Sequence, residues 1–412
     1  MKFIHTADLH LDTPFTGIKD DEAAPTALWE TLHAAPYVSF ERIVTDAIQA
    51  SVDFVLIVGD VFDSKNPSAA AHNFLLEQLQ RLNEHQIPVF LSFGNHDFQT
   101  NGKAQLHFPE NVQVFGPQVE TKLLTLKDGT TVAISGFSYD QQAVATDMVR
   151  AYPTGSQADF TIGMLHGAVK SGTDSRYAPF TVPELEEKGY DYWALGHIHK
   201  RQQLDANSPI NYPGDIQGRH KNEPGEKGYL LVSTDSTDHR LTTEFVATSP
   251  VVYAPLEITI TQAMSVTEVV DQLVATIQAA DFSKLHLLNV VLNATTAGIN
   301  TTVAVNSQNG ILLGQLQQAL RSQYDQLNAW VYELTVNETE SLQFADLDEA
   351  FWRDTQAEVF TESHVNELAK KLFQQDFIYQ ALGNPTALTE LRRQSETFLQ
   401  GKTNQEEFTD ED

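Results

Sequence analysis

The chain has 412 residues, of which 41% are hydrophobic and 20% charged, the composition of a soluble globular protein with two domains or one large domain and an appendage. It contains no cysteine, which excludes disulfides, thiolate metal sites and a cysteine nucleophile. The formal net charge of −29 argues against an autonomous, non-specific DNA binder, because such binding depends on Lys and Arg neutralising phosphates.

The N-terminus lacks the apolar stretch and small-residue cleavage site of a signal peptide. No run of about 18 apolar residues is present, so no transmembrane helix is expected. These two features predict a cytoplasmic protein without a membrane segment.

Residues 1–250 are expected to alternate strands and helices. Apolar runs rich in β-branched residues predict strands at 2–7, 53–58, 88–92, 131–135, 160–165, 192–195, 229–233 and 241–246, and one-sided apolar spacing predicts helices at 40–50 and 69–86. Polar clusters lie just after the carboxyl ends of several of these strands, where ligands bind in α/β sheets.

The pattern changes near residue 250. Strands at 256–260, 285–291 and 330–336, with helices at 266–277 and 311–322, predict a small β-α-β-α-β domain over 251–340. Residues 341–412 are predicted to form C-terminal helices and an acidic, disordered tail. We therefore expect three parts, the first being the catalytic domain.

Four polar clusters carry the chemistry. They are Asp8-Leu9-His10, Gly59-Asp60-Val61-Phe62-Asp63, Gly94-Asn95-His96-Asp97, and His166 together with Gly196-His197-Ile198-His199. On an extended segment, residues i and i+2 point the same way, so Asp8 and His10 are expected to reach one ion together. A glycine before Asp60, Asn95 and His197 allows a tight turn that exposes the next side chain.

Imidazole, carboxylate and amide donors without sulfur suit Mn, Fe or Zn rather than a structural zinc site. Seven donors exceed what one tetrahedral ion needs, and they suit two ions that share a bridging carboxylate. Such a pair lowers the pKa of a bridging water, and the resulting hydroxide attacks phosphorus in line. His96 is then placed to protonate the leaving alkoxide, with the carboxylate of Asp63 holding its ring N–H.

In this order, the clusters resemble the calcineurin-like metallophosphoesterase superfamily, whose pattern is D-x-H, G-D-x-x-D, G-N-H-D/E, H and G-H-x-H. The resemblance covers roughly residues 1–235, and every element is present. Residues 3–11 resemble the start of the SbcD and Mre11 nucleases. Residues 12–15 and 212–220 resemble the YhaO-type branch of DNA repair exonucleases.

The resemblance implies an α/β fold, a four-layer αββα sandwich, followed by a small α/β capping domain and C-terminal helices that dock on an SbcC/Rad50-like coiled-coil ATPase. It implies two divalent ions, usually Mn²⁺, and allows a homodimer. The implied metal ligands are Asp8, His10 and His199 for one ion, Asn95, His166 and His197 for the other, and Asp60 as the bridge. His96 is the implied catalytic histidine, supported by Asp63.

Arg219 and His220 belong to the densest basic spot of the chain. They are expected either to bind a substrate phosphate or to form a solvated turn. Asp215 lies close by in sequence, and its carboxylate would repel a phosphate unless it is paired with Arg219 or Lys221.

Three functions compete at this point. The first is an Mn-dependent exonuclease or endonuclease subunit acting on DNA with an ATPase partner. The second is a small-molecule phosphodiesterase or phosphatase, which suits an acidic protein because a nucleotide needs no long basic groove. The third is a scaffold or regulatory subunit, against which the intact set of seven ligands argues.

Overall fold

The computed structural model describes residues 1–99, 107–170, 176–206, 208–234, 240–260, 264–294 and 301–338, with residues 361 and 364. It divides into two compact units, Met1–Ala254 with Lys284–His286, and Pro255–Ser283 with Leu287–Asp412. The predicted division at 250 and 340 into three parts remains a prediction. The predicted C-terminal helices and acidic tail lie outside the described residues, apart from two isolated positions.

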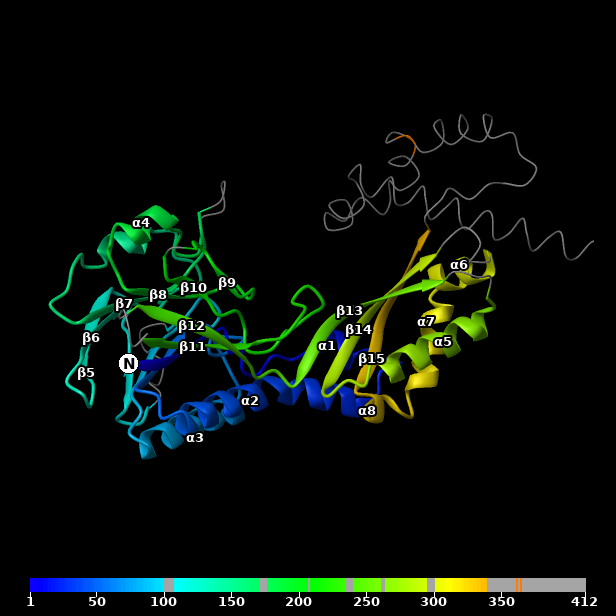
Figure 1. The fold of residues 1–412 in the computed structure, drawn as a ribbon, viewed down its shortest axis with the longest axis horizontal. Coiled ribbons are helices and arrows are strands. Elements are labelled where there is room, and N and C mark those ends of the chain that lie inside the picture. Colours follow the sequence, from blue (N-terminus) through cyan, green and yellow to red (C-terminus); the bar gives the residue numbers. More distant parts are fainter. Residues whose placement is uncertain are drawn as a thin grey trace, which may run out of the picture. The chain divides into compact units, whose positions relative to one another are not determined.

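The first unit contains two six-stranded sheets (Figure 1). In the first sheet the order is β12 (Leu241–Ala247), β11 (Gly228–Thr234), β1 (Lys2–Ala7), β2 (Phe54–Val58), β3 (Val89–Ser92) and β4 (Val112–Val114). Strands β1 to β4 are parallel, whereas β11 and β12 pair antiparallel. The carboxyl ends of β1, β2 and β3 therefore meet at one edge.

The second sheet has the order β5 (Glu120–Thr125), β6 (Thr131–Gly136), β7 (Phe160–His166), β8 (Tyr192–Gly196), β10 (Ile210–Tyr212) and β9 (Gln202–Gln203). Its four central strands are parallel, and the two edge strands β5 and β9 are antiparallel. The carboxyl ends of β7 and β8 thus also lie side by side.

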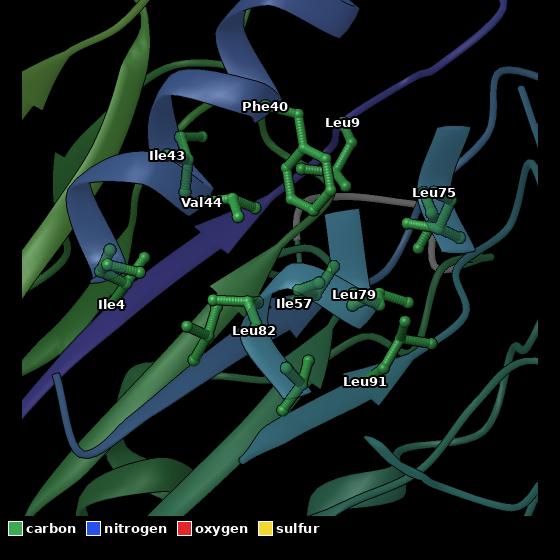
Figure 2. Close-up of a cluster of buried hydrophobic side chains, with 14 of the residues drawn as sticks. Ile4, Leu9, Phe40, Ile43, Val44, Ile57, Leu75, Leu79, Leu82 and Leu91 are labelled. Carbon is green, nitrogen blue, oxygen red and sulfur yellow. The ribbon is translucent and has the colours of Figure 1, made fainter. Parts of the chain in front are cut away.

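Alternation along the strands builds the layers, because successive side chains point to opposite faces. Phe3, Phe54 and Leu56 lie in a core shared with side chains of the second sheet, such as Ile162. Residues of the opposite face, such as Ile4 and Ile57, pack with side chains of α2 (Thr26–Gln49) and α3 (Ala69–Glu84). Figure 2 shows this second core, with Phe40, Ile43 and Val44 of α2 and Leu75, Leu79 and Leu82 of α3.

The outer face of the second sheet carries a third core. Side chains of η1 (Met148–Ala151), α4 (Val182–Glu186) and the intervening loops pack there with Trp193 and Leu195 of β8. The three cores separate four layers: a layer of helices, the first sheet, the second sheet, and a layer of helices and loops. This order confirms the predicted four-layer α/β sandwich.

Helix α2 begins much earlier than predicted, at Thr26 rather than at residue 40, and it includes Pro36. Its first half buries Leu28, Leu32 and Ala35, which continue the buried side of the predicted half at helical spacing. A proline inside a helix removes a hydrogen bond at a cost of about 3 kcal/mol, and burial of this apolar side offsets that cost. The short elements β4, β5, β9, β10, α1 (Thr16–Lys19) and α4 were also not predicted.

A third sheet, of order β13-β14-β15, belongs mainly to the second unit. Its strands are β13 (Val251–Ile260), β14 (Leu285–Ala294) and β15 (Ala329–Glu338), with α5 (Val266–Ala279) between the first two. Three helices, α6 (Thr301–Gln308), α7 (Ile311–Leu320) and α8 (Tyr324–Leu327), separate β14 from β15, where one helix was predicted. Among the residues that the structure describes, no helix is long and apolar enough to cross a membrane.

Candidate metal centre

The predicted ligands converge where the carboxyl ends of strands from both sheets meet. Asp8 follows β1, Asp60 comes shortly after β2, and Asn95 after β3. His166 is the last residue of β7, and His197 follows β8. A topology in which these five ends approach one another explains why side chains up to 189 residues apart are in contact.

Asp8, His10 and His199 form one group whose ligand atoms all lie within 4.8 Å of one another. The Nε2 atoms of His10 and His199 are 3.1 Å apart. Two donors that bind one ion at about 2.1 Å each, at roughly a right angle, are about 3 Å apart. The spacing of these nitrogens therefore suits two ligands of a single ion.

Asp60, His166 and His197 form a second group of the same dimensions. The side-chain oxygen of Asn95 lies 3.0 Å from Nε2 of His166 and 3.0 Å from Nδ1 of His197. Four donors thus face one point, and the chemistry and spacing of these residues fit a second divalent ion.

Asp60 connects the two groups. Its Oδ2 atom lies 3.4 Å from Nε2 of His166 and 3.8 Å from Nε2 of His10. A single carboxylate oxygen therefore faces ligands of both groups, which is the position that a bridging ligand requires. The other oxygen, Oδ1, accepts the main-chain N–H of His96 at 2.9 Å and so holds the carboxylate in place.

The tautomer of His166 follows from its surroundings. Its Nδ1 atom lies 3.1 Å from the main-chain oxygen of Val58, which can only accept a hydrogen bond. Nδ1 must therefore carry the proton, and Nε2 is the atom that offers its lone pair to an ion.

The backbone at the ligands differs from the extended segment predicted from the sequence for Asp8 and His10. Both residues have positive φ, 51° and 43°, and so do Asp60 and His197. A left-handed conformation costs a non-glycine residue about 1 kcal/mol or more. Four strained positions among seven predicted ligands indicate that the surrounding structure holds the donors in place at the expense of stability.

The glycines of the motifs act mainly through their missing side chain. Gly59 has φ +76°, as a tight turn requires, and a Cβ there would lie 2.1 Å from Nδ1 of His166. The prediction of a turn does not explain Gly94. A Cβ at Gly94 would lie 2.3 Å from Oδ1 of Asp60, so the close approach of the two loops requires glycine.

Asp97 belongs to the site, although it was not among the predicted site residues. Its fully buried carboxylate accepts main-chain N–H groups of Gly94, Val61 and Phe62 at 2.8, 2.7 and 3.2 Å. It therefore ties the loop that carries Asn95 to the loop that carries Asp60. Its position in the Gly-Asn-His-Asp cluster was the feature of the sequence that could have indicated its role.

The electrostatics suit cation binding. Burial lowers the pKa of His10 to about 3, and burial together with the charge of His166 lowers that of His197 to about 3, so both rings are neutral donors. Burial alone would lower the pKa of His166, but the carboxylates of Asp60 and Asp8 raise it to about 9. Without an ion, a proton on His166 balances the buried carboxylates, and a cation can take over that role.

His96 and Asp63 are in contact, although not as expected. Nδ1 of His96 lies 2.9 Å from the main-chain oxygen of Asp63, so the carbonyl rather than the carboxylate holds the ring. The Asp63 carboxylate instead accepts from Nη1 of Arg219 at 2.8 Å and lies 3.4 Å from Nδ1 of His10.

The basic spot is also arranged differently from the expectation. Asp215 is buried and pairs with Lys227 at 2.6 Å, not with Arg219 or Lys221. The side chain of Arg219 is 16% exposed and faces Asp63, whereas that of His220 is 54% exposed. A substrate contact by Arg219 or His220 stays a prediction.

Residues 1–201 match the sequence model of the calcineurin-like phosphoesterases. Over 271 residues, 65% of this chain and 65% of the relative, the chain is 40% identical to the metallophosphoesterase YhaO of Bacillus subtilis. It is 26% identical over 266 residues to the DNA double-strand break repair protein Mre11 of Methanopyrus kandleri, which covers 57% of this chain and 54% of that protein. It is 29% identical over 208 residues to Mre11 of Thermoplasma acidophilum, covering 47% and 53%.

The chain thus spans between 53% and 65% of the length of these three relatives. The matched region contains strands β1 to β8 and all seven predicted ligands. Residues 1–201 of this chain therefore form a calcineurin-like phosphoesterase domain.

Proposed function

We propose that the chain is a two-metal phosphodiesterase, and that its substrate is DNA. The observation that carries the two-metal proposal is the position of Asp60, whose Oδ2 atom faces Nε2 of both His10 and His166 at 3.8 and 3.4 Å. A lone ion would not need one carboxylate oxygen between two complete groups of donors. Asp8, His10 and His199 would hold one ion, Asn95, His166 and His197 the other, and Mn²⁺ suits these donors, as do Fe and Zn.

Two divalent ions, when bound, would lower the pKa of a water and neutralise the oxygens of the phosphate. A side chain of the protein transfers the proton to the leaving group. The main-chain oxygen of Asp63 holds Nδ1–H of His96, which leaves Nε2 to exchange a proton with the leaving oxygen. Since the carbonyl cannot take a proton, the ring keeps this orientation before and after the transfer.

Similarity to the archaeal Mre11 repair proteins supports DNA as the substrate. With DNA as substrate, we further propose a nuclease subunit that works in the cytoplasm with an SbcC/Rad50-like coiled-coil ATPase and can form a homodimer. The net charge of −29 is in keeping with a partner that supplies the basic surface for DNA.

The second candidate is a nucleotide phosphodiesterase or phosphatase that uses the same ions. The observation that favours it is the same net charge, because a small substrate needs only the ions and a few nearby side chains.

The test starts with the metal-free protein and Mn²⁺. Calorimetry should detect two ions per chain, and the loaded protein should hydrolyse bis-p-nitrophenyl phosphate. The variant His96→Ala should bind both ions but lose hydrolysis. The matched control His85→Ala changes an exposed histidine outside the site, and it should keep both ion binding and hydrolysis. Binding of one ion or none would contradict the two-metal proposal.

The substrate is tested with linear duplex and single-stranded DNA beside cyclic and linear nucleotides, with and without a purified coiled-coil ATPase partner. Cleavage of DNA that requires Mn²⁺ and His96 supports the nuclease. Hydrolysis of nucleotides without cleavage of DNA, even with the partner present, would favour the second candidate.

A further inference from the structure

We propose that Glu223 is a positioning residue that fixes the ring tautomer of His199 for metal binding, with Arg219 holding its carboxylate. This deepens the two-metal proposal and rests on it. Neither the motif pattern nor the spacing of the sequence indicates Glu223.

The contact between Glu223 and His199 is short and direct. Oε1 of Glu223 lies 2.6 Å from Nδ1 of His199, and the side chain of Glu223 is only 8% exposed. A buried, ionised carboxylate can only accept a hydrogen bond, so Nδ1 of His199 carries the proton. The lone pair is then on Nε2, the atom that lies 3.1 Å from Nε2 of His10 in the candidate site.

The carboxylate is itself held at its second oxygen. Oε2 of Glu223 accepts the main-chain N–H of Arg219 at 2.7 Å, and the N–H of Glu223 donates to the main-chain oxygen of His220 at 3.0 Å. Both carboxylate oxygens therefore have fixed partners, so Glu223 has a defined orientation toward the imidazole.

The guanidinium of Arg219 joins this arrangement to the second histidine of the same group. Nη1 lies 2.8 Å from Oδ1 of Asp63, and Nη2 lies 3.8 Å from Oε1 of Glu223. The same Oδ1 of Asp63 is 3.4 Å from Nδ1 of His10. Arg219 thus stands between two carboxylates, each of which faces Nδ1 of a histidine whose Nε2 points into the site.

A competing assignment would have Arg219 donate to the rings, since its Nη1 and Nη2 lie 3.2 and 3.3 Å from Nδ1 of His10 and His199. At His199 the carboxylate contact is shorter by a wide margin, 2.6 Å against 3.3 Å, and it is charge-assisted. Donation from Arg219 would also put the proton on Nε2, where it would block the ligand atom. The carboxylate is therefore the partner of the ring.

His199, Asp215 and Glu223 also lie within ligand distance of one another, which could suggest a third ion. However, Nζ of Lys227 is 2.6 Å from Oδ1 of Asp215 and 2.8 Å from the main-chain oxygen of His199. The ammonium group supplies the positive charge that this group requires. Glu223 therefore acts on the ring of His199 rather than on an ion of its own.

Only the first group depends on this support. In the second group, the main-chain oxygen of Val58 holds Nδ1 of His166, and no contact of Glu223 reaches His166, His197 or Asn95 in the described part of the chain. Loss of Glu223 should therefore weaken one of the two ions selectively.

The experiment measures Mn²⁺ binding to the metal-free, full-length protein by calorimetry and by electron paramagnetic resonance. Glu223→Ala should weaken one of the two sites about 10- to 100-fold and leave the other unchanged. Glu223→Gln should give a smaller loss at the same site, because it keeps one accepting oxygen. Some loss should remain, because that single oxygen cannot accept from both Arg219 and His199. Glu226→Ala removes a carboxylate of the same loop that pairs with Lys284, and it should bind both ions normally.

Nitrogen chemical shifts of ¹⁵N-labelled histidine in the metal-free protein provide a second readout. His199 should be protonated at Nδ1 in the wild type, lose this preference in Glu223→Ala and keep it only in part in Glu223→Gln. If Glu223→Ala does not fold, as judged by circular dichroism, the inference is tested with Glu223→Gln and with the nitrogen chemical shifts of the wild-type protein. A wild-type His199 protonated at Nε2 would overturn the inference.

Unchanged affinity in both variants, or an equal loss at both sites, would also overturn the inference while the two-metal proposal stands. A wild-type protein that binds fewer than two ions would instead contradict the two-metal proposal. The two failures are therefore distinguishable from one another.

Discussion

Nδ1 of His96 lies 2.9 Å from the main-chain oxygen of Asp63. The sequence predicted that the carboxylate of Asp63 would hold the ring of His96, whereas the main-chain oxygen of Asp63 does so. The carbonyl of Asp63 orients the histidine, while its carboxylate faces Arg219 and His10.

Replacing His96 with alanine should lower kcat for a diester by about 10²- to 10⁴-fold, the usual contribution of a positioned general acid. Steady-state kinetics with bis-p-nitrophenyl phosphate at saturating Mn²⁺ measures this loss. Metal content should stay at the wild-type value, because no predicted ligand is removed. A variant with wild-type kcat would remove His96 from the proposed mechanism.

Asp63→Asn should behave differently from His96→Ala. The main-chain oxygen is unaffected by the substitution, so the ring of His96 keeps its orientation and kcat at saturating Mn²⁺ should stay within about 10-fold of the wild type, less than the loss of a general acid. The Mn²⁺ concentration needed for half-maximal activity should rise, because the carboxylate near His10 is lost. A loss of kcat as large as in His96→Ala would show that the carboxylate itself takes part in proton transfer.

The convergence of the predicted ligands could be anticipated from the sequence for a physical reason, whereas the four layers were implied by the family resemblance. Each ligand ends a buried strand or lies shortly after its carboxyl end, and parallel strands bring such positions to one edge. By contrast, the start of α2 at Thr26 could not be recognised, because the apolar side that stabilises it becomes evident only when the sheet is present.

The support around the ligands was beyond the reach of sequence patterns. Asp215 lies closer in sequence to Arg219 than to Lys227, yet it pairs with Lys227, because neighbours in sequence need not face each other in a turn. Glu223 acts on His199, 24 residues earlier in the chain, through a contact that no periodicity predicts. Side-chain partners of this kind depend on loop geometry rather than on residue type.

Asp60→Asn should remove both ions rather than one. The substitution preserves the shape of the side chain, but it removes the negative charge between His10 and His166 that a bridge requires. Calorimetric titration with Mn²⁺ should therefore show no tight binding, whereas Asp140→Asn, at an exposed position, should bind two ions. Retention of one tight ion would mean that Asp60 belongs to a single group.

His5 should make the stability of the metal-free protein depend on pH. It is fully buried, its Nε2 donates to the main-chain oxygen of Leu195, and burial lowers its pKa to about 3 from an ordinary 6.5. The unfolded chain therefore binds more protons between these values, so stability falls as pH drops from 6.5 toward 3, by an amount on the order of a few kcal/mol. Urea unfolding of wild type and His5→Gln at several pH values measures the contribution as the difference between the two profiles.

The pH-dependent difference should vanish above about pH 7, where His5 is neutral in both states. His10 and His197 change the profile in the same direction, but they are present in both proteins and cancel in the comparison. Parallel profiles for wild type and His5→Gln down to pH 5 would show that His5 is not protonated on unfolding.

Gly94→Ala tests how closely the loops must approach. The added Cβ would lie 2.3 Å from Oδ1 and 2.7 Å from the main-chain nitrogen of Asp60, and 2.7 Å from Nε2 of His166. Because one of these neighbours is backbone, the loop must shift, at a cost of about 1–3 kcal/mol. Gly17→Ala, where nothing lies within 4 Å, should be neutral or slightly stabilising.

The shift at Gly94 should affect metal binding as well as stability, because it displaces the carboxylate of Asp60, which lies between the two groups of donors. Gly94→Ala should therefore lower both the thermal midpoint of the metal-free protein and the affinity for Mn²⁺. A lower midpoint with wild-type Mn²⁺ affinity would show that the position of Asp60 tolerates movement, and it would weaken the case for a geometrically demanding bridge.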